Sequence, residues 1–271
     1  MPENKPADRV LLEIRDQVAY VTLNRPDKYN GLDMGLFHGL TATAKTLAKN
    51  RDIRAVILQG AGPAFCSGLD VKGVSANPLN FARLLFKPGR RISNLAQDVG
   101  YLWRKVPAPV IAVTHGVCFG GGLQIALGAD FRYSTPDCQF CIMEAKWGLI
   151  PDMSLTVTLA ELMPIDKAKA LTMTARKFDG NEALALGVVT QVSEDPLAAA
   201  EAFVQELKQK SPDSTAATKL LFNQAWQADD KTALGLESSL QKKVLGRANQ
   251  RIALARNGSE PDKPFLPRRG F

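Results

Sequence analysis

Two glycine-bearing segments, each directly after an apolar run, hold the residue types best suited to bind a reacting group. The first, 64–72, contains Ser-Gly-Leu-Asp and follows residues 55–58. The second, 115–124, contains three consecutive glycines and follows residues 110–113. Glycine opens backbone conformations that other residues avoid and lets a ligand approach the main chain closely. Each segment could therefore present a backbone N–H, and two such donors meeting at one point would stabilise a developing oxyanion.

The second segment leads into residues 123–128, which are apolar and compatible with a helix. The first N–H groups of a helix lack internal partners and carry the positive end of its dipole, so an anion is favoured near Gly121. A tight turn that only packs a strand against a helix is the alternative. The segment is neither a phosphate-binding P-loop nor a dinucleotide fingerprint, because it has no Gly-Lys-Ser/Thr and no G-x-G-x-x-G spacing.

Together with further segments, the two loops resemble the enoyl-CoA hydratase/isomerase (crotonase) superfamily across about residues 10–225. The resemblance implies an α/β fold, a crotonase-like spiral of ββα units over residues 1–208. It also implies a helical C-terminal region, 209–271, that assembles trimers or pairs of trimers. The segments that carry it are N-R-P-x-x-x-N at 24–30, S-G-x-D at 67–70, the proline-rich strand entry 106–112, the acidic stretch 140–151 and the segment 174–189.

The resemblance assigns the two oxyanion donors to the N–H groups of Leu69 and Gly121, and the substrate to a coenzyme A thioester. It also marks two positions for acids. Hydratases of the family carry Glu where this chain has Gln124, and an amide cannot accept a proton at neutral pH. Glu144 matches the second position. Burial among Ile142 and other apolar neighbours (Met143, Trp147 and Leu149) would raise its pKa toward the working range.

A further carboxylate, Asp152, lies eight residues after Glu144. Dienoyl-CoA isomerases of the superfamily carry an acid pair with this spacing and use it to move a proton between distant carbons, although they have Asp in place of Gln124. Three structural alternatives remain open. Asp152 could cap a helix that begins near Met153; Glu144 could be a salt-bridged strand residue; and Gln124 could bond locally in its helix instead of lining the acyl pocket.

For coenzyme A, the resemblance points to contacts from Lys28, Ser67, Leu69 and Lys72, with plain surface charge as the alternative for each lysine. No cofactor beyond the coenzyme A part of the substrate is expected. The favoured reaction is double-bond isomerisation of an enoyl- or dienoyl-CoA. The nearest alternative is hydration of a 2-enoyl-CoA, with water held by Gln124 and Glu144. An RNA-binding homologue without catalysis is the alternative of another class.

The amino-acid composition limits the classes of partner that the protein is expected to bind. A net charge of +7 suits nucleic acid, an anionic membrane or an acidic ligand, but most basic residues are scattered and no nucleic-acid motif is present. We expect neither nucleic acid nor membrane as a partner. Cys138 and Cys141 have C-x-x-C spacing, yet a zinc site needs about four ligands and no second pair exists, so no metal is expected. Residues 1–6 lack an apolar secretory core, which indicates a cytoplasmic protein.

The elements that must position these residues can be read in outline. Alternating residues over 9–23 predict a strand hairpin, and 33–49 predict a helix. The stretch 73–105, interrupted by proline and glycine, is expected to be less regular and to cover the acyl chain. Two helices are expected at 215–228 and 231–257. The tail, 258–271, is rich in Pro and Arg and is expected to be poorly ordered unless a neighbour holds it.

Overall fold

The computed structural model describes residues 9–87 and 89–270, and its centre is a six-stranded sheet. The strand order is β1-β2-β3-β4-β6-β8; β1 pairs antiparallel with β2 and the other neighbours run parallel. A separate, small parallel sheet pairs β5 with β7. The strands are β1 (Val10–Arg15), β2 (Val18–Leu23), β3 (Ala55–Gly60), β4 (Val110–Thr114), β5 (Val117–Phe119), β6 (Phe131–Ser134), β7 (Gln139–Cys141) and β8 (Gln191–Val192).

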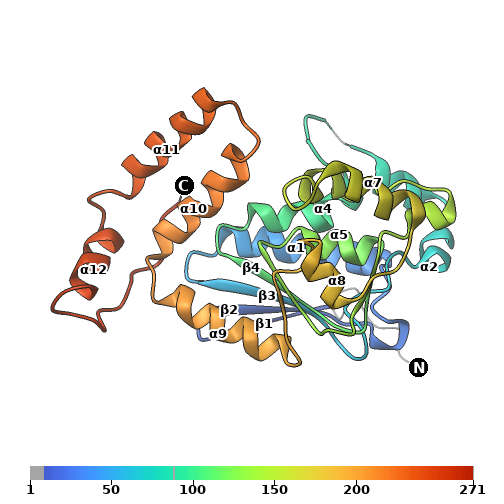
Figure 1. The fold of residues 1–271 in the computed structure, drawn as a ribbon, viewed down its shortest axis with the longest axis horizontal. Coiled ribbons are helices and arrows are strands. Elements are labelled where there is room, and N and C mark those ends of the chain that lie inside the picture. Colours follow the sequence, from blue (N-terminus) through green and yellow to red (C-terminus); the bar gives the residue numbers. More distant parts are fainter. Residues whose placement is uncertain (1–8, 88, 271) are drawn as a thin grey trace.

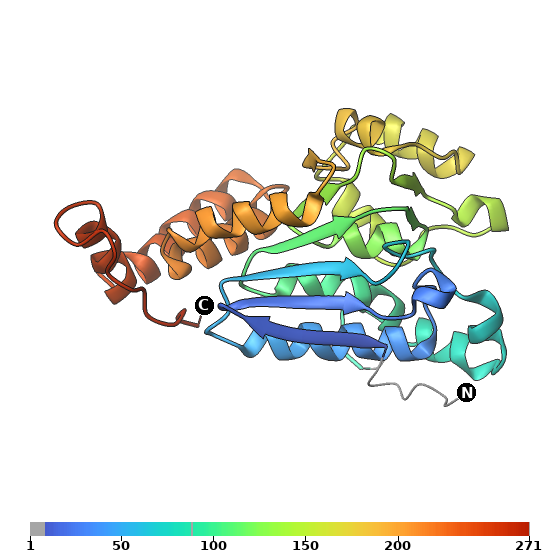
Figure 2. The same cartoon turned by 90° about the horizontal axis from the view of Figure 1, so that it is seen from below.

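Helices cover both faces of the sheet, as a parallel sheet requires. On one face α1 (Met34–Lys49), α4 (Leu95–Tyr101) and α5 (Gly121–Leu127) enclose the larger apolar core. On the other face α9 (Pro196–Lys208) packs against β3, β4 and β6 (Figure 2). The predicted hairpin is confirmed, and so is the first predicted helix, which the Asp33 side chain caps by accepting from the N–H of Leu36.

The stretch 73–105 is more regular than the sequence indicated. It holds most of α2 (Val71–Ser75), then α3 (Leu79–Leu85), α4 and the 3-10 turn η3 (Leu102–Lys105). The prediction was wrong because capping side chains supply local start signals: Asn94 and Gln97 form a reciprocal capping box at α4. The remaining elements before α9 are η2 (Pro26–Lys28), η4 (Glu144–Trp147), α6 (Leu155–Leu159), α7 (Ile165–Thr174) and α8 (Gly180–Ala185).

The C-terminal part is helical, as predicted, and extends away from the sheet (Figure 1). It consists of α10 (Pro212–Ala225), α11 (Asp230–Val244) and α12 (Ala248–Arg256). The single helix expected over 231–257 is wrong, because the chain turns at Gly246, where φ is +71°. The proposed division at residue 208 stays a prediction.

The tail also differs from its expectation. Its described residues, 258–270, are bonded to other parts of the same chain. The buried carboxylate of Asp213 accepts from the N–H of Arg269 at 2.7 Å and from the Nδ2 of Asn249 at 3.1 Å. The Arg268 guanidinium donates to the carbonyl oxygen of Asn50 at 2.8 Å. Buried polar groups with several partners fix the tail, a constraint that composition does not reveal.

The four cysteines are buried and free, as expected for small apolar side chains. Burial raises the pKa of the Cys66 thiol to about 12, so this thiol stays protonated. Within the described residues, no cluster of three or more His, Cys, Asp or Glu side chains could hold a metal ion. Among the helices of residues 9–87 and 89–270, none has both the length and the apolar character needed to cross a bilayer. The first eight residues lie outside the described part.

Candidate functional site

The two glycine-bearing segments meet, as the strand order requires for loops that follow neighbouring strands β3 and β4. The N–H of Cys66 donates to the carbonyl oxygen of Val117 at 3.1 Å, and the N–H of Phe119 donates to the carbonyl oxygen of Cys66 at 3.0 Å. Cys66 and Cys118 thus form a parallel β-bridge between the segments. The bridge fixes the register of one loop against the other.

Glycines make this contact sterically possible. Gly68 has φ of +91°, and a Cβ there would lie 2.9 Å from the carbonyl oxygen of Phe119 and 3.6 Å from the nitrogen of Gly121. A Cβ on Gly122 would lie 2.6 Å from the carbonyl oxygen of Cys66. Because these obstacles are backbone atoms, a side chain at either position would push the segments apart.

Two backbone donors remain available at this junction. Within the described residues, no hydrogen bond engages the N–H of Leu69 or Gly121. Their neighbours are satisfied: the N–H of Asp70 donates to Leu32 at 3.1 Å, and that of Gly120 donates to Cys141 at 2.8 Å. Gly121 is the first residue of α5, where an intrahelical partner cannot exist. Both N–H groups therefore lack a partner within the described residues, and their role as oxyanion donors stays a prediction.

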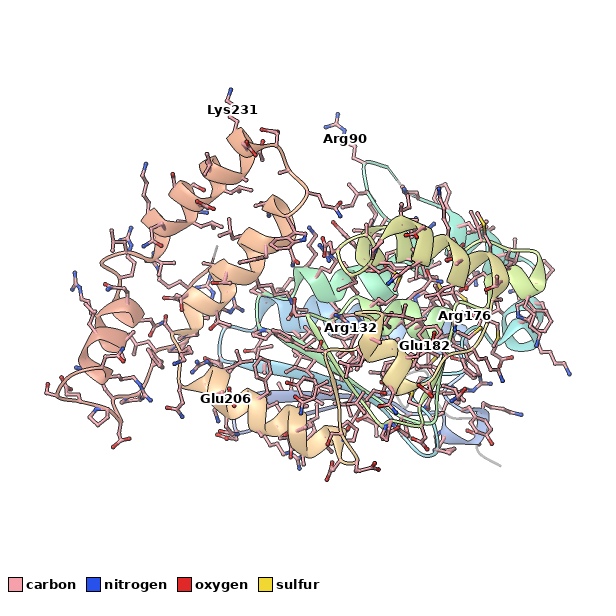
Figure 3. All side chains as sticks on the ribbon, viewed as in Figure 1. Arg90, Arg132, Arg176, Glu182, Glu206 and Lys231 are labelled. Atoms are coloured by element: carbon pink, nitrogen blue, oxygen red, sulfur yellow. The ribbon has the colours of Figure 1, made fainter. Side chains whose placement is uncertain are left out.

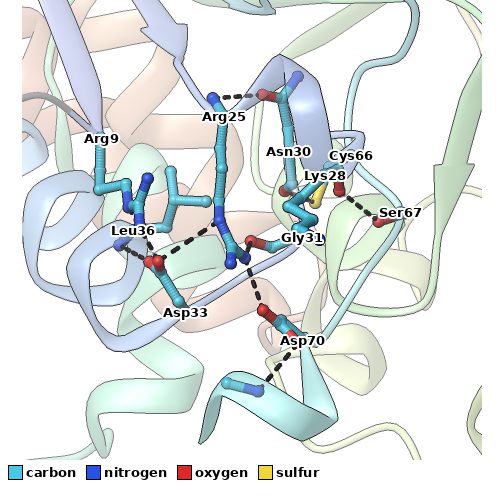
Figure 4. Close-up of polar contacts among 11 residues, drawn as sticks. Arg9, Arg25, Lys28, Asn30, Gly31, Asp33, Leu36, Cys66, Ser67 and Asp70 are labelled. Carbon is cyan, nitrogen blue, oxygen red and sulfur yellow. Dashed lines mark hydrogen bonds and ion pairs between the residues drawn. The ribbon is translucent and has the colours of Figure 1, made fainter. Parts of the chain in front are cut away.

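A brace from the N-R-P-x-x-x-N motif holds the first loop (Figure 4). The Arg25 guanidinium donates to the Asp70 carboxylate at 2.7 Å and to the carbonyl oxygen of Gly31 at 2.9 Å. The fully buried Asn30 amide donates to the carbonyl oxygens of Ala61 and Ala64, at 2.9 and 2.8 Å. This role was not predicted from the sequence, although two polar side chains around a proline turn could have indicated it.

The residues proposed for coenzyme A lie around the same loop. The Ser67 hydroxyl donates to the carbonyl oxygen of Lys28 at 3.4 Å, so these two residues are neighbours. The side chain of Lys28 is exposed, as is that of Lys72 on α2. Other exposed basic side chains stand on separate elements: Arg90 lies before α4 and Lys231 near the start of α11 (Figure 3).

Glu144 begins η4 directly after β7, beside the start of α5. Its Oε1 accepts a hydrogen bond from the Nε2 of Gln124 at 2.7 Å. The same oxygen lies 3.4 Å from the position that a Cβ on Gly120 would occupy. Its Oε2 is buried and has no hydrogen-bond partner among the described residues. One carboxyl oxygen is therefore engaged, and the other is buried without a partner among the described residues.

Gln124 is only 1% exposed, and both ends of its amide bond to distant residues. Its Oε1 accepts from the N–H of Met153 at 2.8 Å, while its Nε2 donates to Glu144. The alternative that Gln124 bonds only within its own helix is wrong. Its amide joins the segment that bears Glu144 to the segment that bears Asp152.

Asp152 precedes α6, but it does not cap that helix. The residue at the cap position is Ser154, in a left-handed conformation with φ of +77°, and no side chain caps the helix. The capping alternative for Asp152 is therefore wrong. Asp152 reaches solvent, yet partial burial raises the pKa of its carboxyl above the usual range.

Burial raises the pKa of Glu144, and the negative charge of Asp152 raises it further. The hydrogen bond from Gln124 acts in the opposite direction. The predicted apolar surroundings are only partly right: Ile142 is 2% exposed, but Trp147 and Leu149 are 63% and 59% exposed. Burial of Glu144 comes instead from its position against Gly120 and Gln124.

Comparison with known proteins gives relatives of two kinds. Over 217 residues, the chain is 32% identical to the mitochondrial Delta(3,5)-Delta(2,4)-dienoyl-CoA isomerase of Rattus norvegicus, covering 75% of this chain and 64% of that protein. It is 28% identical to a short-chain-enoyl-CoA hydratase of Clostridium acetobutylicum over 91% of this chain and 93% of that one. The chain thus spans less than two thirds of the isomerase.

Solved structures agree on the fold. An enoyl-CoA hydratase from Bacillus anthracis superposes with a TM-score of 0.85 at 23% identity, over 96% of this chain and 99% of that one. The crotonase-like α/β fold predicted from the sequence is confirmed. Residues 13–257 match the family described as enoyl-CoA hydratase/isomerase, which is most of the chain. The chain therefore belongs to the enoyl-CoA hydratase/isomerase family.

Proposed function

We propose that the protein isomerises an unsaturated acyl-CoA thioester, converting a 3,5-dienoyl-CoA to a 2,4-dienoyl-CoA. The observation that carries this proposal is the pairing of two carboxyls, Glu144 and Asp152, each with a raised pKa, around a third position that cannot titrate. Resemblance to a dienoyl-CoA isomerase at 32% identity supports the same choice. Groups that give and take protons near neutral pH are what a proton shift between carbons requires.

The reaction removes a proton from C2 and delivers one to C6, while the double bonds move one carbon toward the thioester. The N–H groups of Leu69 and Gly121 would stabilise the negative charge that gathers on the thioester oxygen. Glu144 lies beside the start of α5, and its ionised Oε2 would take the C2 proton. Asp152, carrying a proton, would supply C6. Solvent then restores the two carboxyls to their starting protonation.

Binding of coenzyme A follows from the same loop. Ser67 and Leu69 would meet the adenine through main-chain atoms, and the exposed Lys28 and Lys72 would attract the phosphates. No other cofactor enters this mechanism. Assembly into trimers or hexamers through the C-terminal helices stays a prediction. So does a cytoplasmic location, since the rat relative is named as mitochondrial.

Hydration of a 2-enoyl-CoA is the second candidate. It is favoured by the hydratase of Clostridium acetobutylicum, which is similar over nearly the whole of both chains. In that reaction Glu144 would act on a bound water and on the substrate carbon. Gln124 weighs against it, because an amide cannot accept a proton as a second acid would, and its Nε2 is already bonded to Glu144. The RNA-binding alternative has no such support.

The deciding experiment offers purified protein a 3,5-dienoyl-CoA and follows the ultraviolet absorbance of the 2,4-dienoyl thioester. Asp152→Asn, which keeps the shape of the side chain, is measured alongside, and 2-enoyl-CoA hydration is assayed in parallel. Conversion by the wild type and a loss of at least about a hundredfold in Asp152→Asn would support isomerisation. Hydration without dienoyl conversion would overturn the proposal in favour of the hydratase.

A further inference from the structure

The amide of Gln124 has only one orientation that satisfies its surroundings. The N–H of Met153 can only donate, so the amide atom 2.8 Å from it must be the oxygen. The amide nitrogen then faces Glu144 Oε1 at 2.7 Å and must donate to it. Since Oε1 already accepts this hydrogen bond and Oε2 accepts none, a proton carried by Glu144 is favoured at Oε2.

We infer that Gln124 is a positioning residue that directs proton exchange to Oε2 of Glu144 and links Glu144 to the Asp152 segment. This inference rests on the proposed function for the identity of the two carboxyls as proton carriers. The observations behind it are geometric: an engaged Oε1, a buried Oε2 without a partner, and a bond to the residue that follows Asp152.

The backbone around this amide is tightly packed. A Cβ on Gly100, on α4, would lie 2.8 Å from the carbonyl oxygen of Gln124 and 3.0 Å from that of Met153. Helix α4 therefore packs directly against α5, which bears Gln124, and against the segment that follows Asp152. Packed in this way, neither segment can move far without the other, and the amide bond sets their relative position.

The amide of Gln124 can donate a hydrogen bond to Glu144 at every pH, whereas a carboxyl at this position could donate only when protonated. An ionised carboxylate at this position could accept from Met153 but could not donate to Glu144, and its charge would repel the Glu144 carboxylate. Two adjacent carboxyls would share one proton and titrate as a pair. With Gln124 the donor is present at every pH, so its hydrogen bond favours the ionised form of Glu144 without adding a second group that titrates.

Two substitutions separate the role of the donor from that of packing. Gln124→Met keeps the length of the side chain and removes both bonds. Gln124→Glu restores a donor only when the introduced carboxyl holds a proton. We expect Gln124→Met to lower kcat about a hundredfold, the cost of a small misplacement of a reacting group, with KM unchanged. We expect Gln124→Glu to be similarly impaired at high pH and to recover as pH falls.

Gln59→Met is the matched control. It removes the bond from Gln59 to Thr22, between β3 and β2, and should keep its activity.

A second readout does not depend on turnover. Infrared difference spectra between the protein and Glu144→Gln, recorded across pH, follow the carboxyl stretch of Glu144. Loss of the Gln124 bond should raise the pKa of Glu144, because that bond favours the ionised form. If the wild type fails on dienoyl-CoA but the titration still shifts in Gln124→Met, the proposed function is wrong and the positioning role stands. A Gln124→Met protein with wild-type kcat and an unshifted titration would overturn the inference, as would a Gln124→Glu protein without pH-dependent recovery.

Discussion

The buried carboxyl of Glu144 lowers the stability of the folded protein when it ionises, and the proposed mechanism uses the same carboxyl. Burial disfavours its ionised form, so its pKa in the folded protein lies above that in the unfolded chain. The unfolded chain then ionises first as pH rises. Stability that is present below the ordinary pKa is lost as pH rises toward the raised one. A residue kept despite such a cost is typical of a functional site.

Replacing the Glu144 carboxyl by an amide should remove this dependence of stability on pH. In Glu144→Gln, the gain in free energy of unfolding over the wild type should be larger at about pH 8 than at about pH 4. Urea unfolding at both pH values measures it. The control is Glu182→Gln on α8, which removes an exposed pair with Arg176 (Figure 3), bonded at 3.0 Å. Arg176 lowers the pKa of Glu182, so this variant should instead lose stability toward high pH. Equal differences at both pH values for Glu144→Gln would contradict the assignment.

At this scale the sequence predicted residue types better than their contacts. Glu144, Asp152 and Gln124 could be singled out, because a carboxyl or amide at a fixed spacing is visible in the chain. The bond from Met153 to Gln124 could not, since a backbone N–H carries no signature in the sequence. The capping alternative for Asp152 failed because α6 begins only at Leu155, two residues later than the apolar run suggested.

Among the elements, the contact between the two glycine-bearing loops does most to position the donors. Gly122 faces the backbone of Cys66 from within α5, at a distance that leaves no room for a methyl group. Strands β3 and β4 direct both loops to the same edge of the sheet. The sequence predicted these strands and loops from their apolar runs. The brace from Arg25 and Asn30 was missed because it acts across up to 45 residues of chain.

Adding one methyl group at Gly122 should push the two glycine-bearing segments apart. We expect Gly122→Ala to lower kcat by at least about a hundredfold, because displacements near 1 Å are costly at a reacting centre. Its thermal midpoint should also fall, as overpacking destabilises by about 1–3 kcal/mol. Gly235→Ala on α11 is the control: its Cβ meets nothing within 4 Å, and it should be neutral or more stable. Full activity in Gly122→Ala would mean that the donors do not depend on this contact.

Over the whole molecule, the C-terminal helices are joined to the sheet by charges buried under α10. The Nζ of Lys219, on α10, lies 2.6 Å from the Asp130 carboxylate and donates to the carbonyl oxygen of Trp103 at 3.0 Å. Beside it, Arg104 and Glu161 form a two-bond pair at 2.7 Å. Burial lowers the pKa of Lys219, and Asp130 opposes that shift. The sequence predicted the helices but not this anchor, since a lone lysine in a helical run usually indicates a solvated face.

The anchor predicts how the C-terminal region would detach. Asp130→Asn keeps an acceptor for the N–H of Val110, which bonds to Asp130 at 2.7 Å, but leaves the Lys219 ammonium without its counter-charge. Stranding a buried charge costs about 3–5 kcal/mol, so urea unfolding should show a loss of that order. Protease cleavage within α11 and α12 should become faster if the loss of stability is confined to the C-terminal helices.

Adding Lys219→Met removes the stranded charge and keeps most of the side-chain volume, so the double variant should recover much of the stability. Recovery would locate the cost in the buried charge; a double variant as unstable as Asp130→Asn alone would locate it in the contacts of Asp130 with the sheet.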